Sequence, residues 1–446
     1  MLRFFARRPA LGLILSFLFL IILGSILLKI PYFHIGRLSW VDSVFTATSA
    51  TCVTGLIVKD TPNDFTRAGQ IVILILIQLG GMGIMTFSMS IAVLLGKKLG
   101  FASKTIINKM IDYDRPGYTV FILKKVISLM IIVEFIGTIF LIVAFSKNGI
   151  HENLIFHSVF HCISAFCNAG FSTFSNSLMN FSTSFSINII VMSLIILGGL
   201  GFFVLIEAYS FLVKKIRNDA IIKKPSIQLK MVLYSSIFLI LAGTIMFFAI
   251  ESTNILKGMP FGEKVLISSF QSVTTRTAGF NTINIGMLNR VTLLIFIMLM
   301  FVGAGPGGTA GGIKITTVFV FLKSVFAMAT NSKEVYAFGR KVPEEIVNKA
   351  SAVFFISILI NFVAICILSF TESAFSLKEI MFEVVSAFGT VGLSTGLTGD
   401  LSQIGRVVII VLMFIGRLGP VTLAVAISKQ NPKVNYSLPE EKVMIG

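Results

Sequence analysis

The chain has 446 residues, of which 55% are hydrophobic and only 13% are charged, and it contains 43 phenylalanines. This composition excludes an ordinary soluble domain and indicates a polytopic membrane protein. The formal net charge is +17, but no soluble basic domain carries it, so a nucleic-acid partner is excluded. No long linker or low-complexity tract divides the sequence, and we expect residues 1–446 to form a single membrane domain.

Apolar stretches long enough to cross a membrane recur along the chain. About 20 apolar residues span a hydrocarbon core of ~30 Å, and on this measure the sequence predicts eight transmembrane helices in an all-α fold. In chain order they are expected over Pro9–Ile30, Ala68–Leu95, Val120–Phe145, Ser186–Val213, Ile227–Ile250, Val291–Ala329, Ala350–Phe370 and Val407–Ile427.

A shorter apolar run lies between the two members of each pair of spans. These runs are too short to cross the membrane, and we predict that they are re-entrant pore helices surrounded by protein or by a water-filled cavity. They are expected over Trp40–Ala50, Leu154–Phe166, Val265–Val273 and Ile380–Phe388.

Four short segments that follow these runs resemble one another. They read SATCVTGL (Ser49–Leu56), SAFCNAGF (Ser164–Phe171), VTTRTAGF (Val273–Phe280) and SAFGTVGL (Ser386–Leu393), and their glycines are spaced 109 to 115 residues apart. The spacing predicts four pseudo-symmetric membrane–pore–membrane repeats around a central pore. Their approximate bounds are 1–98, 99–218, 219–335 and 336–430, with 431–446 as a cytoplasmic tail.

The repeated segments have the properties of a cation filter. A pore helix that points inward presents its negative C-terminal end to the membrane centre. The glycine lets backbone carbonyls line an axis and replace the hydration shell of an ion. The candidate filter residues are Cys52, Val53, Thr54 and Gly55; Cys167, Asn168, Ala169 and Gly170; Arg276, Thr277, Ala278 and Gly279; and Gly389, Thr390, Val391 and Gly392. The alternative is that these glycines serve tight turns or helix packing.

The third segment departs from the other three. It has Val273-Thr274 where the others have Ser-Ala, and it carries Arg276. A charged side chain is costly inside a membrane and is unsuited to lining a cation path. We therefore expect Arg276 to point behind the filter and to pair with carbonyl groups or an acid.

The sixth predicted span contains a glycine-rich break. Residues 303–312 read GAGPGGTAGG, and neither Pro306 nor six glycines can remain in a stable helix. The twelve helical residues before the break advance ~18 Å, so the break falls below an externally placed filter. Arg417 lies eleven residues beyond Arg406 on the last span, at a similar depth. The candidate gate residues are Gly303, Gly305, Pro306, Gly307, Gly308, Gly311, Gly312, Lys314 and Arg417.

Each gate feature also has a structural alternative. The loop could be a packed kink that does not move, and Arg417 could simply tie the fourth repeat to its neighbours. Lys314 is expected to hold the end of the loop against carbonyl groups or an acid. The loop does not match a nucleotide-binding motif, because the Gly-Lys-Ser/Thr ending is missing.

The distribution of lysine and arginine predicts the orientation. These residues concentrate at the termini and in the loops that join one repeat to the next, which places those regions in the cytoplasm. Both termini are therefore expected inside, with the pore helices entering from the outside.

Other polar residues carry weaker signals. A metal site is the less favoured reading of His157, His161, Cys162 and Cys167. Glu134 is expected in mid-membrane, with a structural hydrogen bond or ion pair favoured over a direct function. Helix capping and attraction of cations are possible roles for Asp42, Glu152, Glu263 and Glu379.

The whole chain resembles the Trk/Ktr/HKT superfamily of potassium transporters, and it is most similar to the bacterial Ktr-type membrane subunit. The resemblance rests on TATSATCVTGL, FHCISAFCNAGFS, TRTAGFN, SAFGTVGLS, FVGAGPGGTAGGIK and MFIGRLGP. It implies a homodimer in the bacterial plasma membrane and a cytoplasmic nucleotide-binding regulatory ring of the RCK (KtrA-like) type. It also implies that Gly55 favours potassium, that the glycine loop obstructs the pore and that Arg417 is an electrostatic barrier. Cys52 stands where many relatives have Thr.

We therefore expect passive K⁺ conduction, with the K⁺ ion as the transported substrate and no organic cofactor in this chain. The alternative within this class is a sodium or non-selective cation pathway. An intramembrane enzyme is disfavoured because no Ser/His, paired-Asp or zinc constellation lies at a common depth. A secondary transporter would require two symmetric helix breaks.

Overall fold

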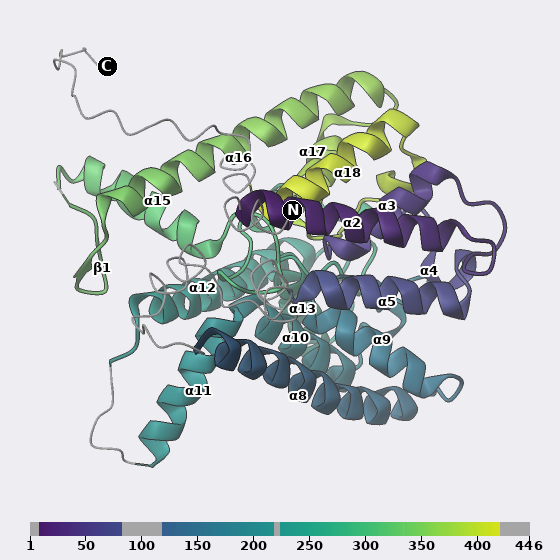
Figure 1. Cartoon of the computed structure of the whole chain (residues 1–446), viewed down its shortest axis with the longest axis horizontal. Helices are drawn as coiled ribbons and strands as arrows, with labels where there is room; N and C mark the ends of the chain where they lie inside the picture. The colour runs from purple at the N-terminus through teal and green to yellow at the C-terminus, as the bar shows by residue number, and fades with distance from the viewer. Residues whose placement is uncertain (1–8, 83–117, 218–223, 333, 420–446) are drawn as a thin grey trace.

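The computed structural model describes residues 9–82, 118–217, 224–332 and 334–419, and these residues form helices and one short hairpin (Figure 1). Four of the described helices are long and apolar enough to cross a membrane, or five if one bent pair is a single span. The chain is thus an all-α polytopic membrane protein.

Each repeat contains a long first helix, a short pore helix and a second helix. Repeat one comprises α2 (Pro9–Lys29), α3 (Trp40–Thr51) and α5 (Arg67–Gly81). Repeat two comprises α8 (Tyr118–Lys147), α9 (Leu154–Phe166) and the pair α10 (Phe185–Leu200) and α11 (Phe202–Ile216). Repeat three comprises α12 (Ile227–Glu251), α13 (Phe261–Thr274) and the pair α14 (Arg290–Phe301) and α15 (Ile315–Ala329). Repeat four comprises α16 (Glu344–Thr371), α17 (Leu377–Gly389) and α18 (Gln403–Leu418).

Within the described residues, the connections contain short elements. They are α4 (Thr61–Asp64) and the 3₁₀ turns η1 (Met179–Phe181), η2 (Ile285–Met287) and η3 (Leu397–Asp400). Between α15 and α16, strand β1 (Tyr336–Ala337) pairs antiparallel with β2 (Arg340–Lys341), with Ala337 opposite Arg340.

Packing between the repeats closes them into a ring. The second helix of each repeat contacts the pore helix of the next repeat: α5 contacts α9, α10 contacts α13, and α14 contacts α17. The series closes because α18 contacts α3, so the last repeat packs against the first. Figure 1 shows this last contact, with the yellow α18 beside the purple N-terminal helices. The four repeats therefore form a closed cycle in which every pore helix packs against a neighbouring repeat.

Each pore helix is anchored by an aromatic side chain at an equivalent position. The four residues are fully buried and are Phe45, Phe160, Phe270 and Phe382. Complete burial of a phenylalanine contributes roughly 1.5–3 kcal/mol. The pore helices are thus fixed by their apolar faces, which leaves their C-terminal ends to meet at the centre.

The fourth span differs from its prediction as one continuous helix over Ser186–Val213. It is broken at Gly201, where α10 and α11 meet at a bend of 102°. Gly201 has φ +95°, and a side chain there would meet the carbonyl oxygen of Pro306. A residue with a Cβ fits neither this backbone conformation nor this close approach, which explains why the chain turns at a glycine.

The other predicted spans agree with the described helices to different extents. The sixth span is split into α14 and α15 at the predicted glycine-rich segment. The second and eighth predicted spans begin as α5 and α18, and their remaining parts lie outside the described residues. The N-terminal residues 1–8 and the tail 431–446 also lie outside them.

Candidate functional site

The four glycine segments meet at the centre in a closed ring, which we call the glycine ring (52–55, 167–170, 276–279 and 389–392). A Cβ placed on Gly55 would lie 2.5 Å from Ala169 O, and one on Gly170 would lie 2.9 Å from Ala278 O. A Cβ on Gly279 would lie 2.6 Å from Val391 O. A Cβ on Gly392 would overlap Thr54 O. Because Thr54 is in repeat one, this contact joins the fourth repeat to the first. Each glycine therefore faces the carbonyl that precedes the glycine of the next repeat.

The backbone of the glycine ring alternates between conformations. All four glycines have positive φ, and so does the residue two positions earlier in each segment: Val53 (57°), Asn168 (59°), Thr277 (70°) and Thr390 (49°). In an ordinary strand, successive residues point to opposite sides. Left-handed residues at every second position can instead direct neighbouring carbonyls to one side, the arrangement that a carbonyl-lined ion path requires.

Three of these left-handed residues are β-branched, which makes the conformation costly. A left-handed L-residue costs roughly 1–2 kcal/mol, and such strain persists only where the surroundings impose it, as at functional sites. The surroundings here are backbone hydrogen bonds to the pore helix. Thr54 N donates to Ser49 O over 2.8 Å, Ala169 N to Ser164 O over 2.7 Å, and Val391 N to Ser386 O over 2.8 Å.

A hydroxyl clamp ties each segment of the ring to its own pore helix. Ser49 Oγ donates to Leu56 O (2.7 Å), Ser164 Oγ to Phe171 O (2.7 Å) and Ser386 Oγ to Leu393 O (2.6 Å). In repeat three, Thr274 Oγ1 donates to Phe280 O. Thr274 is one position closer to its glycine than the serines are to theirs. The sequence departure at Val273-Thr274 is thus a register shift that keeps the clamp.

Arg276 is buried and turned away from the glycine ring toward α12. Its Nη2 donates to Ser236 Oγ over 3.0 Å and its Nη1 to Ser236 O over 3.4 Å. Ser236 O is the carbonyl partner that the sequence analysis anticipated. Two guanidinium nitrogens therefore find partners behind the ring, and the Arg276 backbone alone contributes to the ring.

The glycine-rich segment 303–312 bonds to the other repeats. Gly305 N donates to Gly199 O (2.9 Å) and Thr309 N to Gly198 O (3.2 Å), both in α10. Gly311 N donates to Thr390 Oγ1 in the ring over 3.0 Å. The segment therefore packs directly against the glycine ring.

Two cationic side chains contact the same segment, of which Arg417 is buried and Lys314 is partly buried. Arg417 donates to Thr309 O and to Gly80 O at the end of α5. Lys314 Nζ donates to Ala310 O over 2.5 Å. Arg417 thus connects repeats four, three and one, so it can both tie the loop in place and present positive charge close to the ring.

The two pore-helix histidines have hydroxyl partners. His157 Nδ1 lies 2.6 Å from Thr173 Oγ1, and His161 Nε2 lies 2.9 Å from Ser172 Oγ. Among the described residues, no group of three or more His, Cys, Asp or Glu is placed to hold a metal ion. The metal-site alternative therefore has no support in this region.

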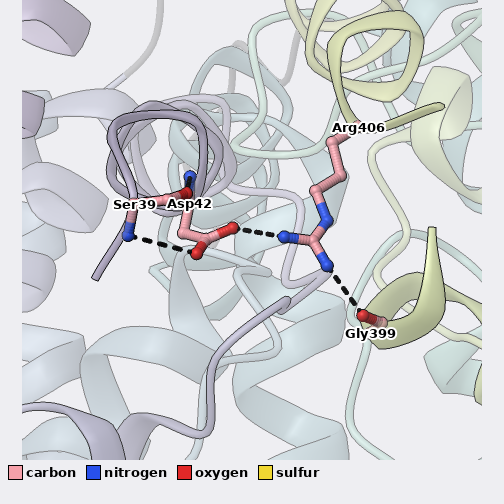
Figure 2. A network of polar contacts seen from close by, with 4 residues as sticks. All are labelled: Ser39, Asp42, Gly399 and Arg406. Carbon is pink, nitrogen blue, oxygen red and sulfur yellow. Dashed lines mark hydrogen bonds and ion pairs between the residues drawn. The ribbon is translucent and has the colours of Figure 1, made fainter. Parts of the chain in front are cut away.

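The acidic residues near the pore-helix starts differ in their surroundings. Asp42 and Glu379 complete capping boxes with Ser39 and Ser376. Asp42 also forms an ion pair with Arg406, which donates to Gly399 O as well (Figure 2). This pair neutralises the Asp42 charge, so Asp42 is not free to concentrate cations. Glu263 lies in the first turn of α13, whereas Glu152 precedes the start of α9.

Comparison with known proteins places this geometry in a family. A match to the TrkH family, described as cation transport protein, covers residues 5–438. The chain belongs to the TrkH family. Its members are cation transport proteins rather than enzymes.

Individual relatives of this TrkH-family chain match almost the whole length. Ktr system potassium uptake protein B of Bacillus subtilis is 39% identical over 98% of this chain and 97% of its own. The protein of the same name in Vibrio alginolyticus is 36% identical, over 97% and 94%. Potassium/sodium uptake protein NtpJ of Enterococcus hirae is 35% identical, over 97% and 96%. The crystal structure of the potassium transporter TrkH from Vibrio parahaemolyticus has the same fold, with a TM-score of 0.74 at 20% identity over 95% of this chain and 85% of that one.

Some parts of the TrkH-family site were missed by the sequence reasoning. Gly198, Gly199 and Gly201 form the surface on which the loop rests, whereas hydropathy predicts one continuous span there. The run GGLG at 198–201 was the signal, because glycine clusters mark helix breaks and close backbone approaches. Glu383 was also missed. It is buried behind the ring and accepts hydrogen bonds from Ser394 and Thr398.

Proposed function

We propose that this chain is the potassium-translocating membrane subunit of a bacterial K⁺ uptake system. The observation that carries the proposal is the glycine ring, in which four glycines each face a carbonyl of the next repeat. The names of two relatives, both potassium uptake proteins and both similar over nearly the full chain, support K⁺ as the transported ion.

Conduction is passive in this proposal. Carbonyls of Thr54, Ala169, Ala278 and Val391 replace the hydration shell of a K⁺ ion. The C-terminal ends of the four pore helices add partial negative charge at the centre. Uptake follows an inside-negative membrane potential, which supplies ~2.3 kcal/mol per charge for each 100 mV.

The segment 303–312 is the proposed gate, held closed by Arg417 and Lys314. Its support is its position against the ring through Thr390 and its bonds to repeats two and four. Opening requires the loop to leave α10 and the Arg417 guanidinium to release Thr309 O. A packed kink without motion would have the same contacts but would never clear the path.

The proposed assembly is a homodimer in the plasma membrane, with both termini in the cytoplasm and a cytoplasmic nucleotide-binding ring as regulatory partner. The concentration of lysine and arginine in the loops between repeats supports the position of the termini, and the naming of the Ktr relatives as components of a system supports a partner subunit. Because this chain lacks a nucleotide-binding motif, any nucleotide would act through the partner.

Flux measurements on the purified protein in liposomes test the proposal. We expect K⁺ to pass in preference to Na⁺ under an imposed potential, and Gly55→Ser to lose this discrimination. Preferential Na⁺ passage by the wild-type protein would support the alternative, a sodium or non-selective pathway, for which the relative named potassium/sodium uptake protein is the favouring observation.

A cellular experiment tests the partner. Cells deficient in potassium uptake should regain growth at low potassium when they produce this chain, and more strongly when they also produce a nucleotide-binding ring protein. Equal growth with and without the ring would count against the regulatory part of the proposal.

A further inference from the structure

A carboxylate lies inside the apolar part of the fold, at the junction of repeats one and two. Glu134 is on α8 and is 9% exposed. Both of its carboxylate oxygens lie 3.0 Å from one atom, Nε2 of Gln78 on α5. Placing an ionisable side chain within a membrane-spanning helix costs free energy. Its presence therefore indicates a function that involves its partner, Gln78.

The equivalent position in repeat three shows that the fold does not require an acid there. Cys162 Sγ on α9 donates to Glu134 O over 3.1 Å, and Ser272 Oγ on α13 donates to Ile240 O over 2.8 Å. In both repeats a glycine three residues later on the first helix packs against the same pore-helix side chain. Ile240 of repeat three is therefore the structural equivalent of Glu134 in repeat two, and an apolar side chain fills that position.

The amide of Gln78 connects Glu134 to the glycine ring. Its Oε1 accepts a hydrogen bond from Cys167 Sγ over 3.7 Å, and Cys167 begins the repeat-two segment of the ring. A carboxylate only accepts hydrogen bonds, so Gln78 must turn its NH₂ group toward Glu134 and its oxygen toward the thiol. Gly81 packs so tightly on Cys167 that a Cβ would overlap the sulfur. The sulfur of Cys167 is therefore packed against α5, the helix that also carries Gln78.

We propose that Glu134 is a positioning residue for the ring, acting through Gln78 to fix the direction of the Cys167 thiol and with it the start of the repeat-two segment. The next residue, Asn168, holds a left-handed conformation that depends on a fixed neighbour. This inference rests on the proposed function, since it assigns Glu134 a part in ion discrimination.

The first test replaces Glu134 with leucine and measures the K⁺/Na⁺ flux ratio in liposomes. We expect the ratio to fall about five-fold, which corresponds to losing one hydrogen bond of ~1 kcal/mol. Thr244→Val is the matched control. It removes a hydroxyl from α12 that donates to Ile240 O of the same helix, and it should leave the ratio unchanged.

The second test exchanges the two side chains in Gln78→Glu/Glu134→Gln. In the exchanged pair, the amide NH₂ of Gln at position 134 donates to the carboxylate of Glu at position 78. That carboxylate also accepts the hydrogen bond from the Cys167 thiol. The exchange should therefore restore the wild-type ratio. If Glu134→Leu lowered the ratio and the exchange did not restore it, the effect would be one of packing and the proposal would be wrong. If Glu134→Leu does not fold, Gln78→Leu carries the same prediction.

A spectroscopic readout separates this inference from the proposed function. The S–H stretching band of Cys167, assigned by difference from Cys167→Ala, should move to higher frequency in Glu134→Leu, because Gln78 is no longer held with its oxygen toward the thiol. An unchanged band together with an unchanged flux ratio would overturn the proposal. Absence of K⁺ flux in the wild-type protein would contradict the proposed function, while the band would still test the role of Glu134.

Discussion

The glycine ring and the glycine-rich loop lie in direct contact, yet they are stabilised in different ways. Each segment of the ring is clamped to the pore helix of its own repeat, as in the bond from Ser386 Oγ to Leu393 O. The loop 303–312 bonds mainly to other repeats, through Gly198, Gly199, Thr390 and Arg417. Local bonds hold a shape whatever the neighbours do, whereas bonds between repeats can be broken by a relative movement. In the proposed function, the ring is therefore the part that keeps its shape and the loop is the part that moves.

The largest expected effect comes from a methyl group in the ring. Gly279→Ala should reduce K⁺ flux in liposomes by roughly 100-fold, because left-handed strain of ~1–2 kcal/mol adds to an overlap with backbone atoms that costs ~1–3 kcal/mol. Gly36→Ala is the matched control, since Gly36 has a similar φ of +71° but nothing within 4 Å of the added Cβ. Equal losses in both variants would mean that the close approach in the ring does not matter.

Weakening the contacts of the loop should raise K⁺ flux rather than lower it. Arg417→Gln removes two hydrogen bonds from a charged donor, each contributing ~1.5–3 kcal/mol, and we expect flux to rise about ten-fold. Arg276→Gln is the control, because Arg276 is also buried but bonds Ser236 on α12 rather than the loop. Folded Arg417→Gln protein with unchanged or reduced flux would support the static kink.

A smaller effect is expected from a single clamp. Ser386→Ala leaves Leu393 O without its hydroxyl donor, at a cost of ~1 kcal/mol, and should lower the K⁺/Na⁺ flux ratio about five-fold. Ser351→Ala removes a hydroxyl that bonds only within α16 and should not change the ratio. An unchanged ratio in Ser386→Ala would show that the ring does not depend on its local clamps.

The smallest effect concerns the hairpin beyond α15. The side-chain hydrogen bond from Lys341, followed by that from Tyr336, holds the pKa of Glu334 below its usual value. A lowered carboxyl pKa gives stability above the unfolded value of ~4.3 that is lost as the pH falls through the folded value. Because the group is exposed, Glu334→Gln should lower the melting temperature only slightly at neutral pH and not in acid. A change in flux would show that the loop also responds to contacts beyond α15.

The sequence predicted the repeat glycines and the pore helices because both leave direct marks. A glycine before Leu or Phe recurs four times, and the helices start within four residues of their predicted positions. It did not predict that Val53, Thr277 and Thr390 are left-handed, because local preference opposes that conformation and only the surrounding bonds impose it. The sequence showed an altered pair of residues at Val273-Thr274. That this is a register shift became clear only from the hydrogen bond between Thr274 Oγ1 and Phe280 O.

The break at Gly201 was missed for a different reason. The residues on both sides are apolar, and hydropathy alone reads them as one span. The glycines at 198–201 mark a place where the helix can break, but the approach of Pro306 from another repeat is a long-range contact that hydropathy does not report. The direction of the Arg276 side chain was easier to predict. A buried charge is costly in any fold unless polar groups surround it, so this side chain was expected to reach a carbonyl or an acid.

The contact between α18 and α3 has a consequence for biosynthesis. It is the junction of the ring that no repeat-to-repeat linker crosses, and its ion pair joins residues 364 positions apart, Asp42 and Arg406. During synthesis from the N-terminus, Asp42 is made long before Arg406, so this ion pair cannot form until the fourth repeat has been inserted. The junction between repeats one and four is therefore the last contact of the ring to form.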